Sequence, residues 1–462
     1  MVTSQMSVKL GTVDHVYVDG ACQWCGEADP DAPVIDEGTV VSTEVSKGIT
    51  FTVYEKADGT HKLVVSGNGA MPTWKTLAAY GYFSTINEFV AEEGITAVAY
   101  GAFQNSTALS SVTLASTVTI IDTLAFSGCT ALTAFEIPST IKEIRNKAFM
   151  GAGVTTVSIP DGILLGTAVW MNCKSLTSAE LGAIKWTDTT GVVRPWVPQQ
   201  CFNGCSKMTE VTFSSKVTAI NKAAFSKTAF TEISIPGHIR SVADSAFASC
   251  ASLTSLTLEE GVRSLGYRAM GACAKLTDVN FNSSELNAFG AGVFVSCYAL
   301  EEITIPEKIT KITADMFYDC KKLSVVDMSA SGVTSIASRA FYKCVEMTEV
   351  KLSDALTTID KNAFYNNRVM PSITIPANVT KILAGAFNYC KGLETVYIDS
   401  ATVVAGLTSN TAMGEVVRYA KTVAINASIT SVPAYITNTF TEVGSVTVDG
   451  VEYVTYSLPA EA

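Results

Sequence analysis

Apolar residues recur along the chain in a repeated unit of about 23 residues, from residue 86 to residue 400. The stretch IPGHIRSVADSAFASCASLTSLTL, residues 235–258, contains one complete copy of this unit. Its marker is Ala-Phe followed at the third position by Cys, and the markers are evenly spaced except for one longer interval between Trp170 and Phe202. A period this regular predicts a repeat array. The marker aromatic residues, or their replacements, are Phe103, Phe126, Phe149, Trp170, Phe202, Phe225, Phe247, Met270, Phe294, Phe317, Phe341, Phe364 and Phe387.

Between markers the pattern is L-x-x-[IV]-x-[IL]-P-x-x-[IV]-T-x-I, with a clear copy in Leu132-TAFEIP-STIKEI. Its first half alternates with period two, which predicts a strand with one buried face, and the V-T-x-I part predicts a second short extended piece. We expect the A-F-x-x-C part to form one or two helical turns with the aromatic ring in the core. A single unit cannot bury its own apolar face, so the units must stack. Prolines that cannot donate to a ladder end several first strands, at Pro138, Pro160, Pro236, Pro306 and Pro376.

Three units resemble the BspA-like leucine-rich repeat of bacterial cell-surface proteins: IPGHIRSVADSAFASCASLTSLTL, IPEKITKITADMFYDCKKLSVVDM and IPANVTKILAGAFNYCKGLETVYI. The resemblance covers about residues 60–400, and KLVVSGNGAMPTW is similar to the segment that often precedes such arrays. We therefore predict a right-handed, mainly β, leucine-rich-repeat-like solenoid, with a parallel sheet on its concave face and short helical turns on the other side. The resemblance implies an extracellular or cell-surface protein that binds proteins or glycans.

Segments outside the array divide the rest of the chain. Residues 1–40 form an N-terminal segment with a linker rich in Pro, Asp and Gly, and residues 41–85 are expected to form a cap built on a β-hairpin. In that cap Asp58-Gly59 separates two alternating strands, which is a strong hairpin signal. The solenoid spans residues 86–400, and residues 401–462 hold a degenerate repeat and a C-terminal cap that closes the last coil.

Composition and charge exclude several classes of function. Hydrophobic residues make up 48% of the chain and charged residues 16%, which suits a buried core, and no apolar run reaches the roughly 20 residues that span a bilayer. A net charge of −11 argues against nucleic acid as a partner. The start of the chain lacks the apolar region of a signal peptide, so either a leader is missing from this sequence or the protein is intracellular. No catalytic motif is present, so we expect a protein without enzymatic activity. We also expect the protein to be a monomer.

Cysteines fall into two groups. Nine occupy the third position after a marker, and we expect them to form a column of small, buried, reduced thiols without disulfides. In the N-terminal segment, His15, Cys22 and Cys25 have a spacing that suits three ligands of a zinc ion, although no fourth ligand is evident. The alternative there is a small hairpin with a local disulfide or two free thiols.

Two surfaces are candidates for ligand binding. The longer interval contains an insertion with Lys185, Trp186, Arg194 and Trp196, which either forms a binding loop or folds back over a neighbouring coil. On the predicted concave face, eight of 26 outward positions are acidic and one is basic, so a basic protein segment or a hydroxyl-rich glycan would suit it. A purely solvated face is the alternative. The residues of that face that we single out are Glu210, Glu232, Asp278, Glu302, Asp327, Glu349 and Tyr397.

We therefore predict a surface or secreted adhesion module whose ligand is a host or microbial protein or a glycan. Two other functions fit the same sequence. The array could be a structural spacer that holds another domain away from the cell, or an intracellular scaffold for protein interactions, which the reduced cysteines would suit.

Overall fold

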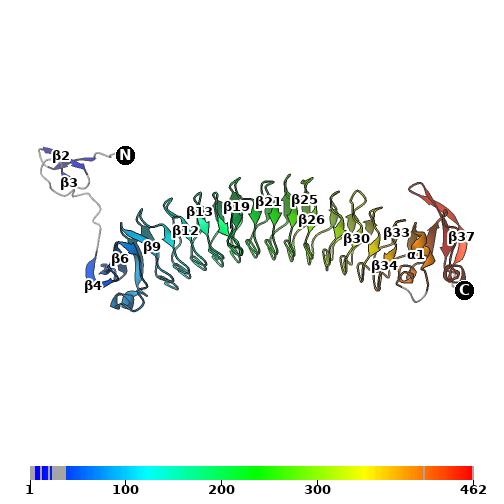
Figure 1. Ribbon diagram of the computed structural model, residues 1–462, viewed down its shortest axis with the longest axis horizontal. Helices are drawn as coiled ribbons and strands as arrows, with labels where there is room; N and C mark the ends of the chain where they lie inside the picture. The colour runs from blue at the N-terminus through cyan, green and yellow to red at the C-terminus, as the bar shows by residue number, and fades with distance from the viewer. Residues whose placement is uncertain (1–5, 11–12, 19–20, 23–37, 409–411, 460–462) are drawn as a thin grey trace.

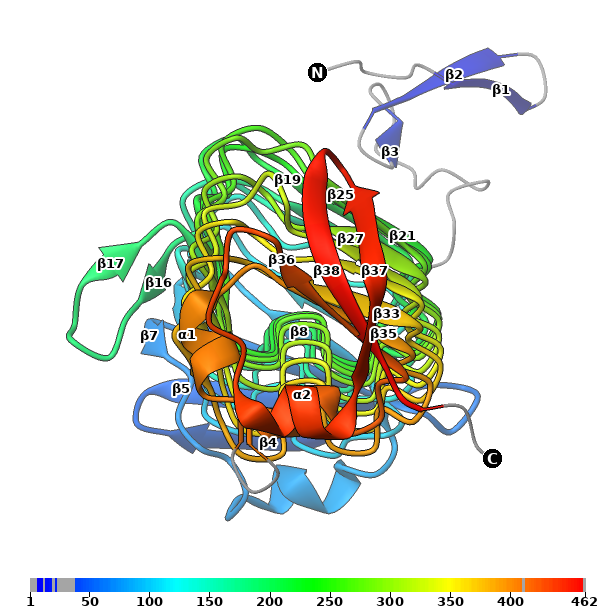
Figure 2. The ribbon, with the colours of Figure 1, turned by 90° about the vertical axis from the view of Figure 1, so that its right-hand side faces the viewer.

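The computed structural model describes residues 6–10, 13–18, 21–22, 38–408 and 412–459. Its repeats stack into one long solenoid that bends into a shallow arch (Figure 1). Most coils contribute a long strand, a short strand and a turn segment that contains the marker residue. Viewed along the solenoid, equivalent parts of successive coils lie over one another (Figure 2).

The long strands pair in parallel with a register that follows the repeat. Ser255 is paired with Asp278, the equivalent residue of the next coil, and the inward residues Leu256 and Leu258 are buried while their neighbours are not. Alternating burial of this kind is what the period-two pattern predicts. The long strands are β8 (Ile86–Ala91), β10 (Ser111–Leu114), β13 (Thr156–Ile159), β15 (Ser178–Leu181), β19 (Glu210–Phe213), β21 (Glu232–Ile235), β23 (Ser255–Leu258), β25 (Asp278–Phe281), β27 (Glu302–Thr304), β29 (Val325–Asp327), β31 (Glu349–Lys351), β33 (Ser372–Ile375), β35 (Thr395–Ile398) and β36 (Thr422–Asn426).

Pairing along the long strands is not continuous. Residues 134–137, which the sequence pattern assigns to a strand, are extended chain without a strand assignment. Phe135 lies there at a position that Val, Ile, Leu or Ala occupies in the other coils, and its ring packs 5.0 Å from that of Phe149. The ladder also stops between β19 and β21, between β25 and β27, and between β31 and β33.

Short strands form a second set of parallel ladders, as the V-T-x-I pattern predicts. Most contribute one residue to the core, such as Ile121, Val242 and Ile312. The short strands are β7 (Gly69–Ala70), β9 (Ile95–Val98), β11 (Ile120–Ile121), β12 (Glu143–Ile144), β14 (Leu164–Leu165), β18 (Trp196–Val197), β20 (Ala219–Ile220), β22 (Ser241–Val242), β24 (Ser264–Leu265), β26 (Ala288–Phe289), β28 (Lys311–Ile312), β30 (Ser335–Ile336), β32 (Thr358–Ile359) and β34 (Lys381–Ile382).

The marker segments of the coils form successive tight turns, and the expectation of one or two helical turns there is wrong in this detail. The residues two before and two after the marker have positive φ, for example Leu124 (60°) and Gly128 (76°) around Phe126. Left-handed residues that recur so closely prevent an α-helix. Backbone N–H groups instead alternate between bonds within the turn and bonds to the next coil, so Ser127 donates to the Leu124 carbonyl and Phe126 donates to the Ala148 carbonyl.

The marker side chains form the centre of the core. Their rings stack along the solenoid, with centroids 5.4 Å apart for Phe202 and Phe225 and 5.1 Å apart for Phe341 and Phe364. Beside this stack the cysteines form a second buried column, and each Sγ of the nine donates to the carbonyl oxygen of the marker residue one coil earlier, as Cys129 does to Phe103 at 3.1 Å. The ten cysteines of the array are free thiols.

Strands β4 (Thr39–Ser46), β5 (Ile49–Glu55) and β6 (His61–Gly67) form an antiparallel sheet at the N-terminal end of the solenoid, and β6 pairs in parallel with β8 of the first coil. Asp58 shapes the β5–β6 turn because its Oδ1 accepts from the Thr60 backbone at 2.9 Å. The short 3-10 helix η1 (Ala78–Tyr82) packs next to this sheet, and Trp74 is fully buried between the rings of Phe51 and Phe103.

At the C-terminal end, β38 (Val451–Ser457) runs antiparallel to β36 and replaces the parallel partner that a further coil would supply. It continues a hairpin with β37 (Thr441–Val448) around Asp449-Gly450. The helices α1 (Ala401–Ala405), η2 (Gly414–Val417) and α2 (Ala434–Thr439) are in the same region. Separately, β1 (Met6–Leu10), β2 (Val13–Val18) and β3 (Ala21–Cys22) form a three-stranded antiparallel sheet.

Candidate functional site

The outward side chains of the long strands form one continuous surface, which we call the strand face. The sequence analysis predicts this face to be the concave, acidic one. Glu210, Glu232 and Glu302 are exposed on it, and no described residue forms an ion pair with any of the three. Their charge is therefore available to a ligand.

Other acidic residues of the strand face have partners. Lys351 lies 3.2 Å from the Glu349 carboxylate and 3.9 Å from that of Asp327. Hydrogen bonds from the Ser329 hydroxyl and backbone lower the pKa of Asp327 below its ordinary value. Asp278 accepts from the Ser255 hydroxyl at 3.1 Å. The free negative charge of this face therefore lies mainly on its middle coils.

The strand face is hollowed where the ladder stops between β25 and β27. A groove of about 440 Å³ lies there, lined by both strands. Asp278 and Glu302 line it together with the amide of Asn280, the hydroxyl of Thr304 and the ring of Phe281. Two residues that the sequence analysis singles out are thus brought together. The groove itself has no signal in the repeat pattern, because its lining comes from residues of different coils that meet only after stacking.

Tyr397, which the sequence analysis also places on the strand face, lies near the C-terminal end of the solenoid on β35. Its ring is 5.2 Å from that of Tyr453 on β38. The structure therefore does not bring Tyr397 together with the acidic residues of the middle coils.

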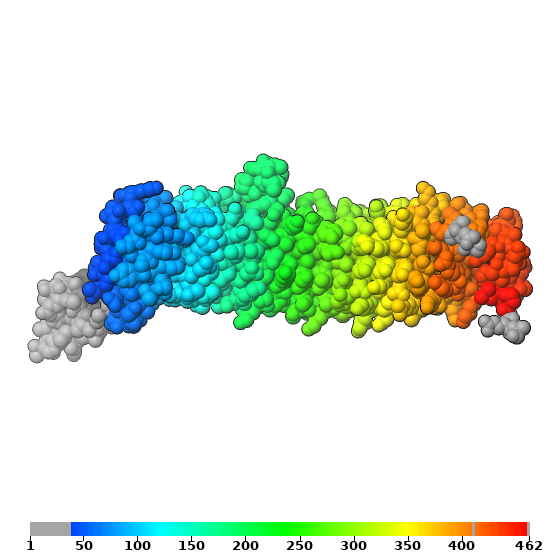
Figure 3. All heavy atoms as spheres, turned by 90° about the horizontal axis from the view of Figure 1, so that it is seen from below, coloured from blue at the N-terminus to red at the C-terminus, as the bar shows by residue number. Residues whose placement is uncertain are grey.

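The insertion forms a β-hairpin that projects from the side of the solenoid (Figures 2 and 3). Its strands are β16 (Trp186–Thr187) and β17 (Val193–Arg194). The hairpin divides the short-strand ladder, because Lys185 bridges to Leu164 on one side while Trp196 pairs with Ala219 on the other. The insertion therefore emerges from within a short strand.

The two tryptophans are at the base of this hairpin, and their rings stack 6.1 Å apart. Trp186 is only 6% exposed and Trp196 is half-buried, so neither is a fully exposed anchor. The Arg194 guanidinium lies 5.4 Å from the Trp196 ring and donates to Asp188 at 3.0 Å. Lys185 is the exposed cation of the four candidate residues.

Asp188 organises the tip of the hairpin. Its Oδ1 accepts from the Thr190 hydroxyl at 2.6 Å and from the Val192 backbone at 2.9 Å. These hydrogen bonds, together with the one from Arg194, hold the pKa of Asp188 well below its ordinary value. The carboxylate is thus used to shape the loop.

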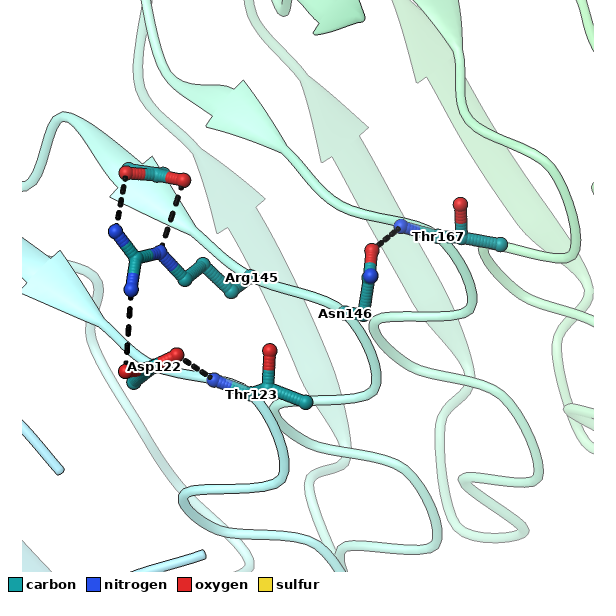
Figure 4. Close-up of polar contacts among 6 residues, drawn as sticks. Asp122, Thr123, Arg145, Asn146 and Thr167 are labelled. Carbon is teal, nitrogen blue, oxygen red and sulfur yellow. Dashed lines mark hydrogen bonds and ion pairs between the residues drawn. The ribbon is translucent and has the colours of Figure 1, made fainter. Parts of the chain in front are cut away.

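A groove of about 350 Å³ lies at the foot of the hairpin, between Trp186, Thr187 and the coils that carry Arg145 and Thr167. Figure 4 shows Arg145 between two carboxylates, those of Asp122 at 3.1 Å and Glu143 at 3.0 Å. Its pKa is raised, chiefly by the hydrogen bond to Glu143. Sequence reasoning did not find this groove, because stacking brings together residues that are far apart in the sequence. Arg145 is already neutralised there.

The proposed zinc ligands fall outside the part of the chain whose side chains the structure describes. By backbone position, His15 lies on β2 and Cys22 on β3, and Cys25 lies outside the described residues. The zinc site remains a prediction. Among the described residues, no group of three or more His, Cys, Asp or Glu side chains is arranged to hold a metal ion, and no helix is long and apolar enough to cross a bilayer.

Stacked coils with parallel strands and an extended outward face define this protein as a leucine-rich-repeat solenoid. The chain belongs to the BspA-type leucine-rich repeat family, whose repeat model matches six copies over residues 76–182, 196–299 and 287–408. The resemblance noted in the sequence is therefore confirmed. No curated protein matches the chain.

The chain is similar to solved structures of bacterial leucine-rich repeat proteins, one of which has a TM-score above 0.5. A protein from Bacteroides ovatus is 20% identical, with a TM-score of 0.56 over 76% of this chain and 94% of its own. A leucine-rich cell-surface protein from Faecalibacterium prausnitzii is 23% identical, with a TM-score of 0.38 over 78% of this chain and 95% of its own. A protein from Eubacterium ventriosum is 22% identical, with a TM-score of 0.45 over 76% and 95%.

Proposed function

We propose that this protein is a non-enzymatic, extracellular or cell-surface adhesion protein whose strand face binds a basic segment of a host or microbial protein. The observation that carries the proposal is the set of unpaired carboxylates on the middle coils, Glu210, Glu232 and Glu302, together with a groove that Glu302 and Asp278 line. Membership of a family of repeat proteins supports a binding role, since solenoids present long surfaces to their partners.

Charge and shape favour a basic ligand over a neutral one. Carboxylates without counter-ions on a chain of net charge −11 attract cations from a distance and speed their association. Thr304 and Asn280 add hydroxyl and amide groups that can hydrogen-bond a peptide backbone or a glycan, and Phe281 adds an apolar wall. A hydroxyl-rich glycan is the second ligand class that this lining fits.

The test compares the full chain with a triple variant, Glu210→Gln, Glu232→Gln and Glu302→Gln, in binding to an octalysine peptide measured by calorimetry at two salt concentrations. We expect the variant to bind about tenfold more weakly, because three exposed charge interactions together are worth roughly 1–3 kcal/mol. The affinity of the unaltered chain should fall as salt rises.

A matched control removes three exposed carboxylates elsewhere, with Glu55→Gln, Glu92→Gln and Glu346→Gln. This control should bind the peptide almost as the unaltered chain does. Equal losses of peptide affinity in both triple variants would show that only the net charge of the protein matters, and would contradict a binding site on the strand face. If no peptide, protein or glycan binds at either salt concentration, the spacer function is favoured instead.

A further inference from the structure

The turn segments form another outward surface, which we call the turn face. Along the solenoid, the size of the side chain at the position that follows the marker changes. In three successive coils a tyrosine occupies it, and the rings of Tyr318, Tyr342 and Tyr365 stack with centroids 4.9 and 4.6 Å apart and nearly parallel planes. In the preceding coils the same position holds Ala248, Gly271 and Val295. The tyrosine ladder therefore ends at Tyr318, next to coils with small side chains.

A groove of about 450 Å³ lies on the turn face where the small side chains meet the first tyrosine. Tyr318, Asp315 and Arg339 line its C-terminal end, where the Arg339 guanidinium lies 5.8 Å from the centroid of the Tyr318 ring. Arg268 and the small residues of the preceding coils line the rest. One face of the Tyr318 ring is covered by Tyr342, and the other is directed toward the coil of Val295, whose smaller side chain covers less of it than a tyrosine would. The hydroxyls of Ser245, Ser249 and Ser296 also line the groove.

Gly292 lies next to two residues that line this groove, Arg268 and Val295. Gly292 lies two positions before its marker at φ +63°, and Arg268 (51°) and Asp315 (56°) occupy the equivalent positions of the adjacent coils with similar backbone angles. The backbone there accepts residues with side chains, so glycine is not needed for its conformation. A Cβ at Gly292 would lie 3.3 Å from Arg268 Cγ and 3.5 Å from Val295 Cγ1. A side chain at Gly292 would therefore press on two residues that line the groove and change its shape.

The charge of this groove is opposite to that of the whole protein. Arg339 donates to Asp315 at 2.9 Å, which neutralises that pair. The guanidinium of Arg268 lies 5.3 Å from the Tyr267 ring and has no carboxylate partner among the described residues. Two arginines and one aspartate leave the groove with a net charge of about +1 on a chain of net charge −11.

We propose that this groove is a second binding site, for one or two acidic sugar residues, and that it acts independently of the strand face. The Arg268 guanidinium would bind the sugar carboxylate by paired, charge-assisted hydrogen bonds. The C–H face of the sugar ring would pack against Tyr318, and its hydroxyls would hydrogen-bond the serine side chains. A polar lining with one aromatic wall suits a sugar better than an apolar ligand.

The experiment measures binding of digalacturonate and of its neutral counterpart, digalactose, to the full chain by calorimetry. We expect digalacturonate to bind and digalactose to bind at least about tenfold more weakly, because only the first offers a carboxylate to Arg268. Arg268→Gln should lower the affinity for digalacturonate by about tenfold. The matched control Arg263→Gln removes an exposed arginine of the same coil, one that already pairs with Glu285 at 2.6 Å, and should leave the affinity unchanged.

Gly292→Asn tests the shape of the groove without changing its charge. Asn362 adopts φ 56° at the same position of a later coil, so the variant should fold with an unchanged melting temperature and lose digalacturonate binding. Octalysine binding to the strand face should be unaffected by Arg268→Gln and Gly292→Asn. The experiment therefore tests the digalacturonate site and the strand-face site independently. Equal binding of digalactose, retained binding in Gly292→Asn, no binding of digalacturonate at millimolar concentration, or tighter binding of an octaglutamate peptide would each overturn the proposal.

Discussion

At the residue scale, the buried thiols show how one position is repeated for its size. Each cysteine of the column lies against the marker residue of the preceding coil and has a carbonyl within reach of its Sγ, as Cys297 does at 3.3 Å from the Met270 oxygen. Thr228 occupies the same slot in another coil and bonds its own marker's carbonyl at 2.8 Å. The slot therefore accepts small side chains, and Ala152, which has no donor, occupies it in a further coil.

Burial of these thiols predicts how stability depends on alkaline pH. Desolvation raises the pKa of Cys129 and of Cys297 to about 12 from an ordinary value near 9, so the folded state keeps its thiol protons where the unfolded chain loses them. The contribution of the two protonated thiols to the free energy of unfolding is fully present below pH 9. It is lost as pH rises toward 12, by up to about 1.4 kcal/mol per pH unit for each thiol. Denaturant unfolding at pH 8, 9, 10 and 11 measures the decline.

A variant with Cys129→Ala and Cys297→Ala supplies the control for this pH dependence. It should be less stable than the unaltered chain at pH 8, because buried side-chain volume is lost, yet it should lose less stability between pH 9 and pH 11. Identical slopes in the two proteins would show that the thiols do not cause the decline.

At the scale of elements, the turn segments and the hairpin mark the limit of what a linear pattern predicts. The sequence predicts both strands of most coils correctly, with residues 134–137 as the exception, since their residues alternate or recur at fixed positions. It does not predict turns in place of helices, because left-handed residues such as Leu124 and Arg268 carry no propensity for that conformation. Bonds between coils, such as that from Phe126 to Ala148, offset their strain.

Trp186 gives a prediction at this scale. Its ring is buried at the base of the hairpin, so Trp186→Ala should destabilise the protein by about 3–5 kcal/mol, as loss of a core aromatic does. Val193→Ala, at an exposed position of β17, should change stability by less than about 0.5 kcal/mol. Chemical denaturation measures both. A small effect of Trp186→Ala would instead mark the ring as a free surface for ligand binding.

At the scale of the whole molecule, the two ends of the solenoid must close exposed strand edges. The apolar residues Val423, Ala424 and Ile425 of β36 are buried, and β36 is paired on one edge with β35 and on the other with β38. The outer strand β37 is interrupted by a register shift between Glu442 and Gly444, which makes that edge a poor template for another chain.

Removal of residues 427–462 should therefore make the protein self-associate. The outer edge of β36 would then offer unpaired backbone groups and apolar side chains to a second chain. Light scattering should show that the apparent mass of the truncated protein rises with concentration. A chain that ends at Leu458 should instead have the same apparent mass as the full chain at each concentration. A truncated protein that stays at one mass and melts as the full chain does would contradict this role for the C-terminal hairpin.

The sequence by itself determined the repeat, its period, the inward and outward positions of the long strands and the acidic character of the strand face. These follow from it because every coil repeats the same local pattern, and a unit that cannot bury its own apolar face must stack. The tertiary structure decided the rest. The groove on the turn face, the missing pairing between β25 and β27 and the burial of Trp186 depend on which residues of neighbouring coils lie side by side, and residues of different coils meet only after stacking.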